Sequence, residues 1–457
     1  MSRVLHRTVS FQPSVAVRGE GLMLTLRDGR QIIDASGGAA VACLGHGNTR
    51  VAAAVGAQAG KLAYAHTGFF TSEPAEALAD ILLENEPGGL SHAFFVSSGS
   101  EAMESALKLA RQYFLERGET DRTRYIARRQ SYHGNTLGSL AAGGNIGRRI
   151  PYEPIFSDRF SLVSPCFPFH YRHDGESDAQ LVARLAEELD QEFQRLGPET
   201  VAAFCAEPVV GATAGCVTAV PGYFPAIRKV CDRYGALLIL DEIMCGVGRT
   251  GTMHAWEREG VTPDIQAIGK GLGGGYQPIA AILIAKHIVA ALTAGTGAFI
   301  HGHTYQAHPV ACAAALEVQR VIREEDLLAN VRIQGALLES LLRERFAEHP
   351  HVGDIRGRGL FFALEFLEDR AHKRPFDPHR HIHEQVKDHA LRRGLGIYPS
   401  GGTIDGRRGD HVLIAPPYIA TSGDIQTIVD RLEQVVNATF DKSTVAKEIR
   451  PFFQESV

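Results

Sequence analysis

The chain has 457 residues, of which 44% are hydrophobic and 22% are charged. This length exceeds what one hydrophobic core usually supports, so we expect a globular protein with two domains. The net charge of −5 gives no reason to expect a nucleic-acid partner. The sequence has neither an N-terminal apolar signal segment nor an apolar run of membrane-spanning length, so it predicts a cytoplasmic protein without a membrane partner.

Residues 1–50 combine short polar strands with turns, and from about residue 85 to 300 apolar runs alternate with helical stretches such as 180–195 and 221–234. The predicted strands of this second region are 92–96, 125–128, 201–206, 236–240, 265–268 and 280–285. Most of them are apolar throughout, which is typical of parallel strands covered on both faces. This pattern predicts an α/β fold with an open, mostly parallel sheet.

The C-terminal third has a different pattern. Residues 310–345 are predicted to form long helices. Beyond Gly359, the strand-like runs are 360–366, 395–398 and 412–415, and the helical runs are 381–393 and 425–440. This order predicts a smaller α+β domain.

Several reactive side chains follow predicted strands. Lys270 follows the run 265–268, and Asp241 ends the run 236–240. Burial lowers the pKa of a lysine, and the free amine can form a Schiff base, while a nearby carboxylate can keep a ring nitrogen protonated. Pyridoxal 5′-phosphate (PLP) needs both groups. The alternatives are a surface lysine in a glycine-rich loop and a carboxylate bound to backbone amides.

A phosphate site is predicted where the run 92–96 ends. Ser98-x-x-Glu101 has the form of a capping box and leads into a helix with apolar residues three and four apart. The amides at this helix N-terminus, with Gly99 and the hydroxyls of Ser98 and Ser100, suit a phosphate. A plain capped helix is the alternative.

Four further residues are candidates for cofactor contacts. Tyr132 follows a strand and could stack on a flat ring, with Ile243 on the opposite face. His133 fits a packing or hydrogen-bonding role as well as a catalytic one. Thr304 could donate a hydrogen bond to phosphate. Because ligands bind at the carboxyl ends of strands in an open parallel sheet, we expect one cleft to gather the residues that follow strands.

Two patterns point away from other cofactors. Gly246-x-Gly248-x-x-Gly251 matches the dinucleotide fingerprint, with Asp264 near the expected ribose position, but five residues separate it from the strand and no helix start follows. The seven cysteines show no CxxC spacing, which predicts buried thiols, and the spacing of the histidines at 301, 303 and 308 does not match a helical ligand pair. We therefore disfavour a nicotinamide-dependent dehydrogenase and expect no metal site.

Taken together, these segments resemble the class III, PLP-dependent aminotransferases of fold type I. The resemblance rests on the order of Gly45-His-Gly47, Ser98–Glu101, Tyr132–Gly134, Ala206-Glu-Pro208, Asp241–Gly251, Lys270, His303-Thr-Tyr305, Arg356–Gly359 and Ala415-Pro-Pro417. It implies a large PLP-binding domain over residues 61–312. It also implies a small domain made from both chain ends, residues 1–60 and 313–457.

The resemblance also implies residue roles. Lys270 forms the Schiff base and Asp241 binds the ring nitrogen, while Glu207 matches a glutamate near the substrate, so these three are the expected catalytic residues. Gly99 and Ser100 hold the phosphate, and Tyr132 and Ile243 enclose the ring. Thr304 reaches the phosphate bound by a neighbouring subunit, so a homodimer with shared active sites is expected.

The expected reaction moves an amino group from an amine or ω-amino acid to a keto acid by a ping-pong mechanism. Cys245 and the His303-Thr-Tyr305 form resemble the branch that uses pyruvate, with 2-oxoglutarate as the alternative acceptor. Gly37–Val41 replaces an aromatic wall of that branch, and neither Arg407 nor Arg408 clearly matches its carboxylate-binding arginine. An ammonia-lyase of the same family and a catalytically inactive binding protein are the remaining alternatives.

Overall fold

The computed structural model describes residues 2–9 and 12–441. Its largest sheet has seven strands in the order β4-β12-β11-β10-β7-β5-β6. These strands are β4 (Leu90–Val96), β12 (Ala280–Ala285), β11 (Ile265–Ile268), β10 (Leu237–Asp241), β7 (Val201–Ala206), β5 (Arg124–Arg128) and β6 (Phe160–Val163). Neighbours pair in parallel except at β12, which is antiparallel to both β11 and β4. The mostly parallel α/β sheet predicted from the sequence is confirmed.

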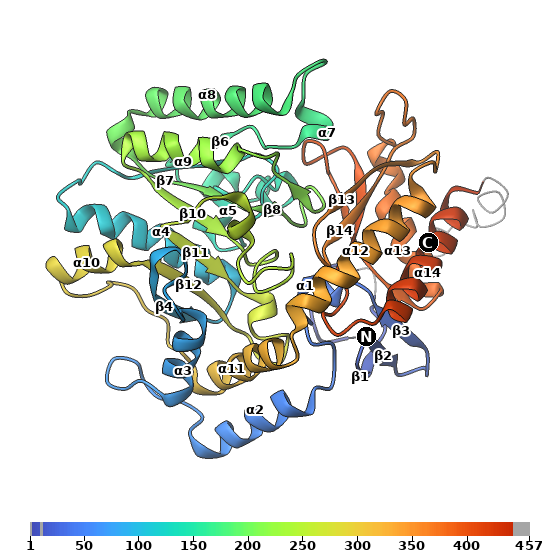
Figure 1. Ribbon diagram of the computed structural model, residues 1–457, viewed down its shortest axis with the longest axis horizontal. Coiled ribbons are helices and arrows are strands. Elements are labelled where there is room, and N and C mark those ends of the chain that lie inside the picture. The colour runs from blue at the N-terminus through green and yellow to red at the C-terminus, as the bar shows by residue number, and fades with distance from the viewer. Residues whose placement is uncertain (1, 10–11, 442–457) are drawn as a thin grey trace.

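Helices cover both faces of this sheet (Figure 1). On β10, Leu238 and Leu240 pack in one apolar cluster with α8 (Asp178–Leu196) and α9 (Tyr223–Tyr234). The alternate residues Leu237 and Ile239 pack in a second cluster with α4 (Gly99–Glu116) and α10 (Lys286–Ala294). Successive side chains of a strand point to opposite faces, so a strand covered on both sides is apolar throughout.

The two ends of the described chain come together beside this sheet (Figure 1). In one sheet, β1 (Ala16–Glu20), β2 (Met23–Leu26) and β3 (Gln31–Asp34) are antiparallel, and β3 pairs in parallel with β15 (Leu395–Gly396). An antiparallel sheet follows the order β13 (Val352–Gly357), β14 (Phe362–Phe366), β17 (Asp410–Ile414) and β16 (Tyr398–Gly401). A short hairpin joins β8 (Val209–Val210) and β9 (Val217–Thr218).

The remaining α-helices of the described residues lie between these strands or after the last one. They are α1 (Gly37–Ala40), α2 (Thr49–Lys61), α3 (Glu73–Leu82), α5 (Leu137–Ala142), α6 (Ile146–Arg149), α7 (Pro168–Tyr171), α11 (Pro309–Glu324), α12 (Leu327–Phe346), α13 (Ile382–Arg392) and α14 (Ser422–Phe440). The domain boundaries at residues 60 and 312 stay predictions, and residues 442–457 of the predicted small domain lie outside the described residues.

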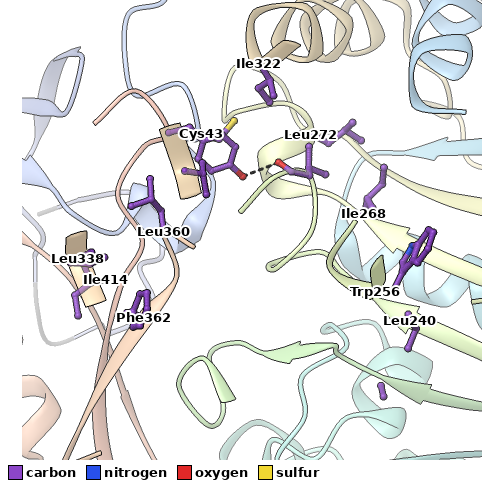
Figure 2. Packing of buried hydrophobic residues seen from close by; sticks show 14 of the residues in the cluster. Cys43, Leu240, Trp256, Ile268, Leu272, Ile322, Leu338, Leu360, Phe362 and Ile414 are labelled. Atoms are coloured by element: carbon purple, nitrogen blue, oxygen red, sulfur yellow. Dashed lines mark hydrogen bonds between the residues drawn. The ribbon is translucent and has the colours of Figure 1, made fainter. Parts of the chain in front are cut away.

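One apolar cluster runs from the large sheet to the C-terminal strands. Figure 2 shows Leu240 and Ile268 from the large sheet and Phe362 and Ile414 from the C-terminal sheet, with Cys43 between them. All seven cysteines are free and buried, as predicted. Within the described ranges, no helix combines the length and the apolar character needed to cross a lipid bilayer.

Candidate active site

A cavity of about 620 Å³ lies at the carboxyl edge of the large sheet. The predicted residues that line it are Gly99 and Ser100 after β4, Tyr132 and His133 after β5, Glu207 after β7, Asp241 and Ile243 at β10, and Lys270 after β11. These strands all run in the same direction, so their carboxyl ends meet at one edge. The structure thus brings together residues that are far apart in the sequence.

Lys270 lines the cavity and is held in a strained backbone conformation. It begins a short 3-10 turn directly after β11, and its φ of 43° lies in the left-handed region that residues other than glycine rarely adopt. Burial lowers the pKa of its amine, although the carboxylates of Asp241 and Glu207 act in the opposite direction. No hydrogen bond joins its Nζ to any residue in the described ranges. The amine is therefore available to react.

Asp241 is buried and fixed through both carboxylate oxygens. Its Oδ2 lies 2.8 Å from the His133 Nδ1, and its Oδ1 accepts a hydrogen bond of 3.0 Å from the Ile243 amide. A buried carboxylate with two such partners keeps its orientation. His133 thus positions Asp241, while its own Nε2 is buried without a partner among the described residues.

Tyr132 is held at both ends. Its amide donates a hydrogen bond of 3.0 Å to the Glu207 Oε1, and its hydroxyl accepts one of 2.9 Å from Arg148. The Glu207 Oε2 accepts a further hydrogen bond of 2.9 Å from the Gly211 amide. Burial raises the pKa of Glu207, since desolvation disfavours its charged form. Glu207 therefore positions two backbone segments of the cavity wall.

The N-terminus of α4 fits an anion. Ser98 caps this helix, because its Oγ accepts a hydrogen bond of 3.2 Å from the Glu101 amide, and its side chain does not line the cavity. Gly99 and Ser100 do line it, and amides of the first helical turn have no acceptor within the helix. A Cβ at Gly99 would lie 2.9 Å from the Ile243 Cγ2, so this position has no space for a side chain. The free amine, the fixed carboxylate and this helix terminus fit PLP.

Three sequence candidates lie elsewhere. Thr304 is in an exposed turn and does not line the cavity, so a role toward a neighbouring subunit stays a prediction. Arg408 is exposed and pairs with Asp405 at 2.7 Å. Neither Arg408 nor Arg407 lines the cavity.

The dinucleotide alternative is wrong. Residues Gly246–Gly251 form turns and no α-helix follows them, because the next helical element is the 3-10 segment Ala255–Glu259. Asp264, the expected ribose ligand, pairs instead with Arg228 at 2.6 Å. A dinucleotide site requires the fingerprint to open a helix.

Sequence reasoning missed several residues that line the cavity. The missed residues include Arg7, Ala39, Asn145, Arg148, His383 and Tyr398. Arg148 lies on α6, which has four residues and too short an apolar pattern to be recognised. Ala39 lies in the segment Gly37–Val41, which the sequence indicated as part of the cavity wall. The sequence did not show which residue of this segment lines the cavity.

A reactive lysine, a fixed carboxylate and an anion-binding helix terminus at the carboxyl edge of a mostly parallel sheet define a PLP-dependent enzyme. The family model "Aminotransferase class-III" matches residues 5–436. The chain therefore belongs to the class III aminotransferase family, so it is a transaminase that uses PLP.

Relatives and solved structures agree with this assignment. An uncharacterized aminotransferase of Schizosaccharomyces pombe is 50% identical over 436 residues, which cover 95% of each chain. The diaminobutyrate–2-oxoglutarate transaminase of Halomonas elongata is 34% identical, over 94% of this chain and 91% of that protein. An amine transaminase from an uncultivated Pseudomonas species, solved in its PLP-bound form, has a TM-score of 0.89 and 33% identity, and the match covers 95% of this chain and 98% of that one.

Proposed function

We propose that the protein moves an amino group from an amine or an ω-amino acid to pyruvate by a ping-pong mechanism. The observation that carries this proposal is the placement of Lys270 and Asp241 in one cavity, with Tyr132 and the N-terminus of α4. The similarity to an amine transaminase supports an amine as donor. The Halomonas elongata relative, whose name gives 2-oxoglutarate, makes that keto acid the second acceptor to test.

PLP, when bound, supplies an aldehyde for the amino group and a ring that accepts electrons. The carboxylate of Asp241 would hold a proton on the ring nitrogen. Its orientation is fixed because the His133 Nδ1 and the Ile243 amide each contact one of its oxygens. Tyr132 and Ile243 would contact the two faces of the ring, and Gly99 and Ser100 would bind the phosphate through the first turn of α4.

Lys270 is the proposed acid and base. Because burial lowers the pKa of its amine, a larger fraction of the Nζ is neutral near pH 7 than in an exposed lysine. The neutral Nζ can accept the proton from the donor carbon that bears nitrogen and can return it during the same half-reaction. The left-handed backbone of Lys270 lies where its side chain lines the cavity.

We also propose a homodimer with shared active sites. Phe69, Phe70 and Tyr305 are 80%, 67% and 60% exposed, which is unusual for large apolar side chains. Thr304 lies beside Tyr305 in the same exposed turn. A second subunit covering these residues would bring Thr304 toward the phosphate of its partner.

A donor and acceptor screen tests this function. Purified holoenzyme with an amine and pyruvate should form alanine in an amount equal to the carbonyl product, and double-reciprocal plots at several pyruvate concentrations should be parallel. If the enzyme formed glutamate from 2-oxoglutarate but no alanine from pyruvate, the amino acceptor would be 2-oxoglutarate instead of pyruvate. If the enzyme released ammonia in the absence of any keto acid, the reaction would be an elimination and not a transamination.

A further inference from the structure

Arg148 is a cation that lines the cavity and has no acidic partner among the described residues. It lines the cavity from α6, and its Nη1 donates to two neutral oxygens, the Tyr132 hydroxyl at 2.9 Å and the Asn135 Oδ1 at 3.4 Å. Within the described part of the chain, its Nη2 and Nε have no hydrogen-bond acceptor, and no carboxylate pairs with the guanidinium. Arg148 is half-buried, so its charge needs no counter-charge within the chain, and its unused N–H groups are available to an acceptor that enters the cavity.

Neighbouring arginines are already used by the protein. Arg149, the next residue, donates three hydrogen bonds of 2.6–3.1 Å to backbone carbonyl oxygens and pairs with Glu153 at 3.6 Å. Arg128 is buried and donates to the Glu207 carbonyl oxygen at 2.5 Å. Arg7 resembles Arg148 instead, because it lines the same cavity without an ion pair to a described residue.

The guanidinium of Arg148 is also held in place. Its carbon atom lies 4.8 Å from the centre of the Tyr132 ring, and the Asn145 side chain caps α6 by accepting a hydrogen bond of 3.3 Å from the Arg148 amide. A planar guanidinium in a fixed position can bind both oxygens of a carboxylate. The Arg148 guanidinium lines the same cavity as Lys270 and is therefore positioned to bind an anion.

We propose that Arg148, assisted by Arg7, binds the carboxylate of the amino donor and of the keto acid. This proposal rests on the proposed transaminase function. It gives the carboxylate-binding role, for which neither Arg407 nor Arg408 was a clear match, to a different part of the chain. The PLP phosphate is assigned elsewhere, to the N-terminus of α4 at Gly99 and Ser100.

A matched pair of donors provides the first test. 4-Aminobutanoate and n-butylamine have the same carbon chain, and only the former has a carboxylate. In Arg148→Gln, kcat/KM for 4-aminobutanoate should fall about 10–100-fold relative to that for n-butylamine, the loss expected for charged hydrogen bonds. The ratio of kcat/KM for 4-aminobutanoate to kcat/KM for n-butylamine should fall less in Arg148→Lys than in Arg148→Gln. It should also fall in Arg7→Gln, by a smaller factor than in Arg148→Gln. In Arg408→Gln it should equal the wild-type ratio.

Butanoate, an unreactive carboxylate, provides a test that needs no turnover. Titration of the holoenzyme, followed by the absorbance of PLP, should give a dissociation constant that rises about 10-fold or more in Arg148→Gln and stays unchanged in Arg408→Gln. The dissociation constant of PLP should not change in any of these variants.

Three results would overturn the proposal. Equal losses for both donors would show that Arg148 acts only by positioning Tyr132. If Arg148→Gln bound PLP more weakly but kept the wild-type ratio of kcat/KM for the two donors, Arg148 would contact the PLP phosphate instead of the substrate. Unchanged butanoate binding would exclude a carboxylate subsite. If the wild-type enzyme turned over neither donor nor any other amine, the proposed function would fail, while the butanoate titration would still decide the role of Arg148.

Discussion

Lys270 is the residue on which the proposed chemistry depends. Substitution to alanine removes the amine that accepts and returns the proton, so alanine formation from an amine and pyruvate should fall by a factor of about 10²–10⁴ or more. Lys286 is a matched control, because it is 74% exposed and lies outside the cavity. Lys286→Ala should retain wild-type rates, and comparable losses in the two variants would contradict the assignment.

The lowered pKa of Lys270 also predicts a pH dependence of stability. The ordinary value is 10.5 and burial lowers it, so below pH 10.5 the folded protein without PLP binds fewer protons at this site than the unfolded chain. Lys270 therefore makes the free energy of unfolding rise with pH in this window. Lys270→Met removes the buried charge and should be more stable than the wild type at pH 7, with a smaller difference at pH 10.

Urea unfolding of both proteins without PLP, at pH 7 and pH 10, measures this difference. Titrating groups distant from Lys270 are common to both proteins and cancel in the comparison. An equal stability difference at the two pH values would mean that the Lys270 amine has an ordinary pKa in the folded protein.

Glu207 is predicted to stabilise the cavity wall rather than to react. Its two oxygens accept hydrogen bonds from the Tyr132 and Gly211 amides, and removing the carboxylate leaves both amides unpaired. Each unpaired buried donor costs about 1–3 kcal/mol, so Glu207→Ala should lower the free energy of unfolding by a few kcal/mol. Glu207→Gln keeps one acceptor oxygen, so its free energy of unfolding should lie between those of the wild type and Glu207→Ala. Chemical denaturation would show the order, and an alanine variant as stable as the wild type would refute this role.

At the scale of elements, the N-terminus of α4 depends on a glycine. A Cβ at Gly99 would lie 2.9 Å from the Ile243 Cγ2, so Gly99→Ala should displace the helix start or the side chain of Ile243. Overpacking of this kind costs about 1–3 kcal/mol, and PLP affinity should fall about 5–100-fold. Gly56→Ala in α2 is a suitable control, because its Cβ would have no atom within 4 Å. Equal PLP affinity in both variants would exclude Gly99 from the cofactor site.

The elements that the sequence predicted are those with continuous apolar runs. The six predicted strands of the large sheet match β4, β5, β7, β10, β11 and β12 to within about two residues at each end, because full burial leaves no polar positions. The direction of β12 could not be predicted, since an apolar run has the same composition in either direction. The mixed segment Phe160–Val163 was missed, although it forms the edge strand β6.

The site was predictable where a functional residue directly follows such a strand. Lys270 and Asp241 have this position, and the structure places both in the cavity. Ser98 and Thr304 were assigned to the cofactor, but neither lines the cavity of one chain. Arg148 could not be found, because its position depends on packing against Tyr132 rather than on a local pattern.

At the scale of the whole molecule, the proposed shared active sites predict complementation between inactive subunits. Thr304→Val removes a hydroxyl on an exposed turn, so it should impair the partner's site while leaving its own Lys270 intact. Refolding an equal mixture of Lys270→Ala and Thr304→Val should restore about a quarter of wild-type activity, since half of the dimers would contain one complete site. Sedimentation should show a dimer. A monomer, or a mixture no more active than its components, would contradict the shared site.

The most direct measurement locates the bond between the cofactor and the protein. Borohydride reduction of the holoenzyme should bleach its absorbance and attach one pyridoxyl group to the peptide that contains Lys270, as found by mass spectrometry after proteolysis. Labelling of another lysine, or of none, would contradict the assignment of Lys270 as the Schiff-base residue.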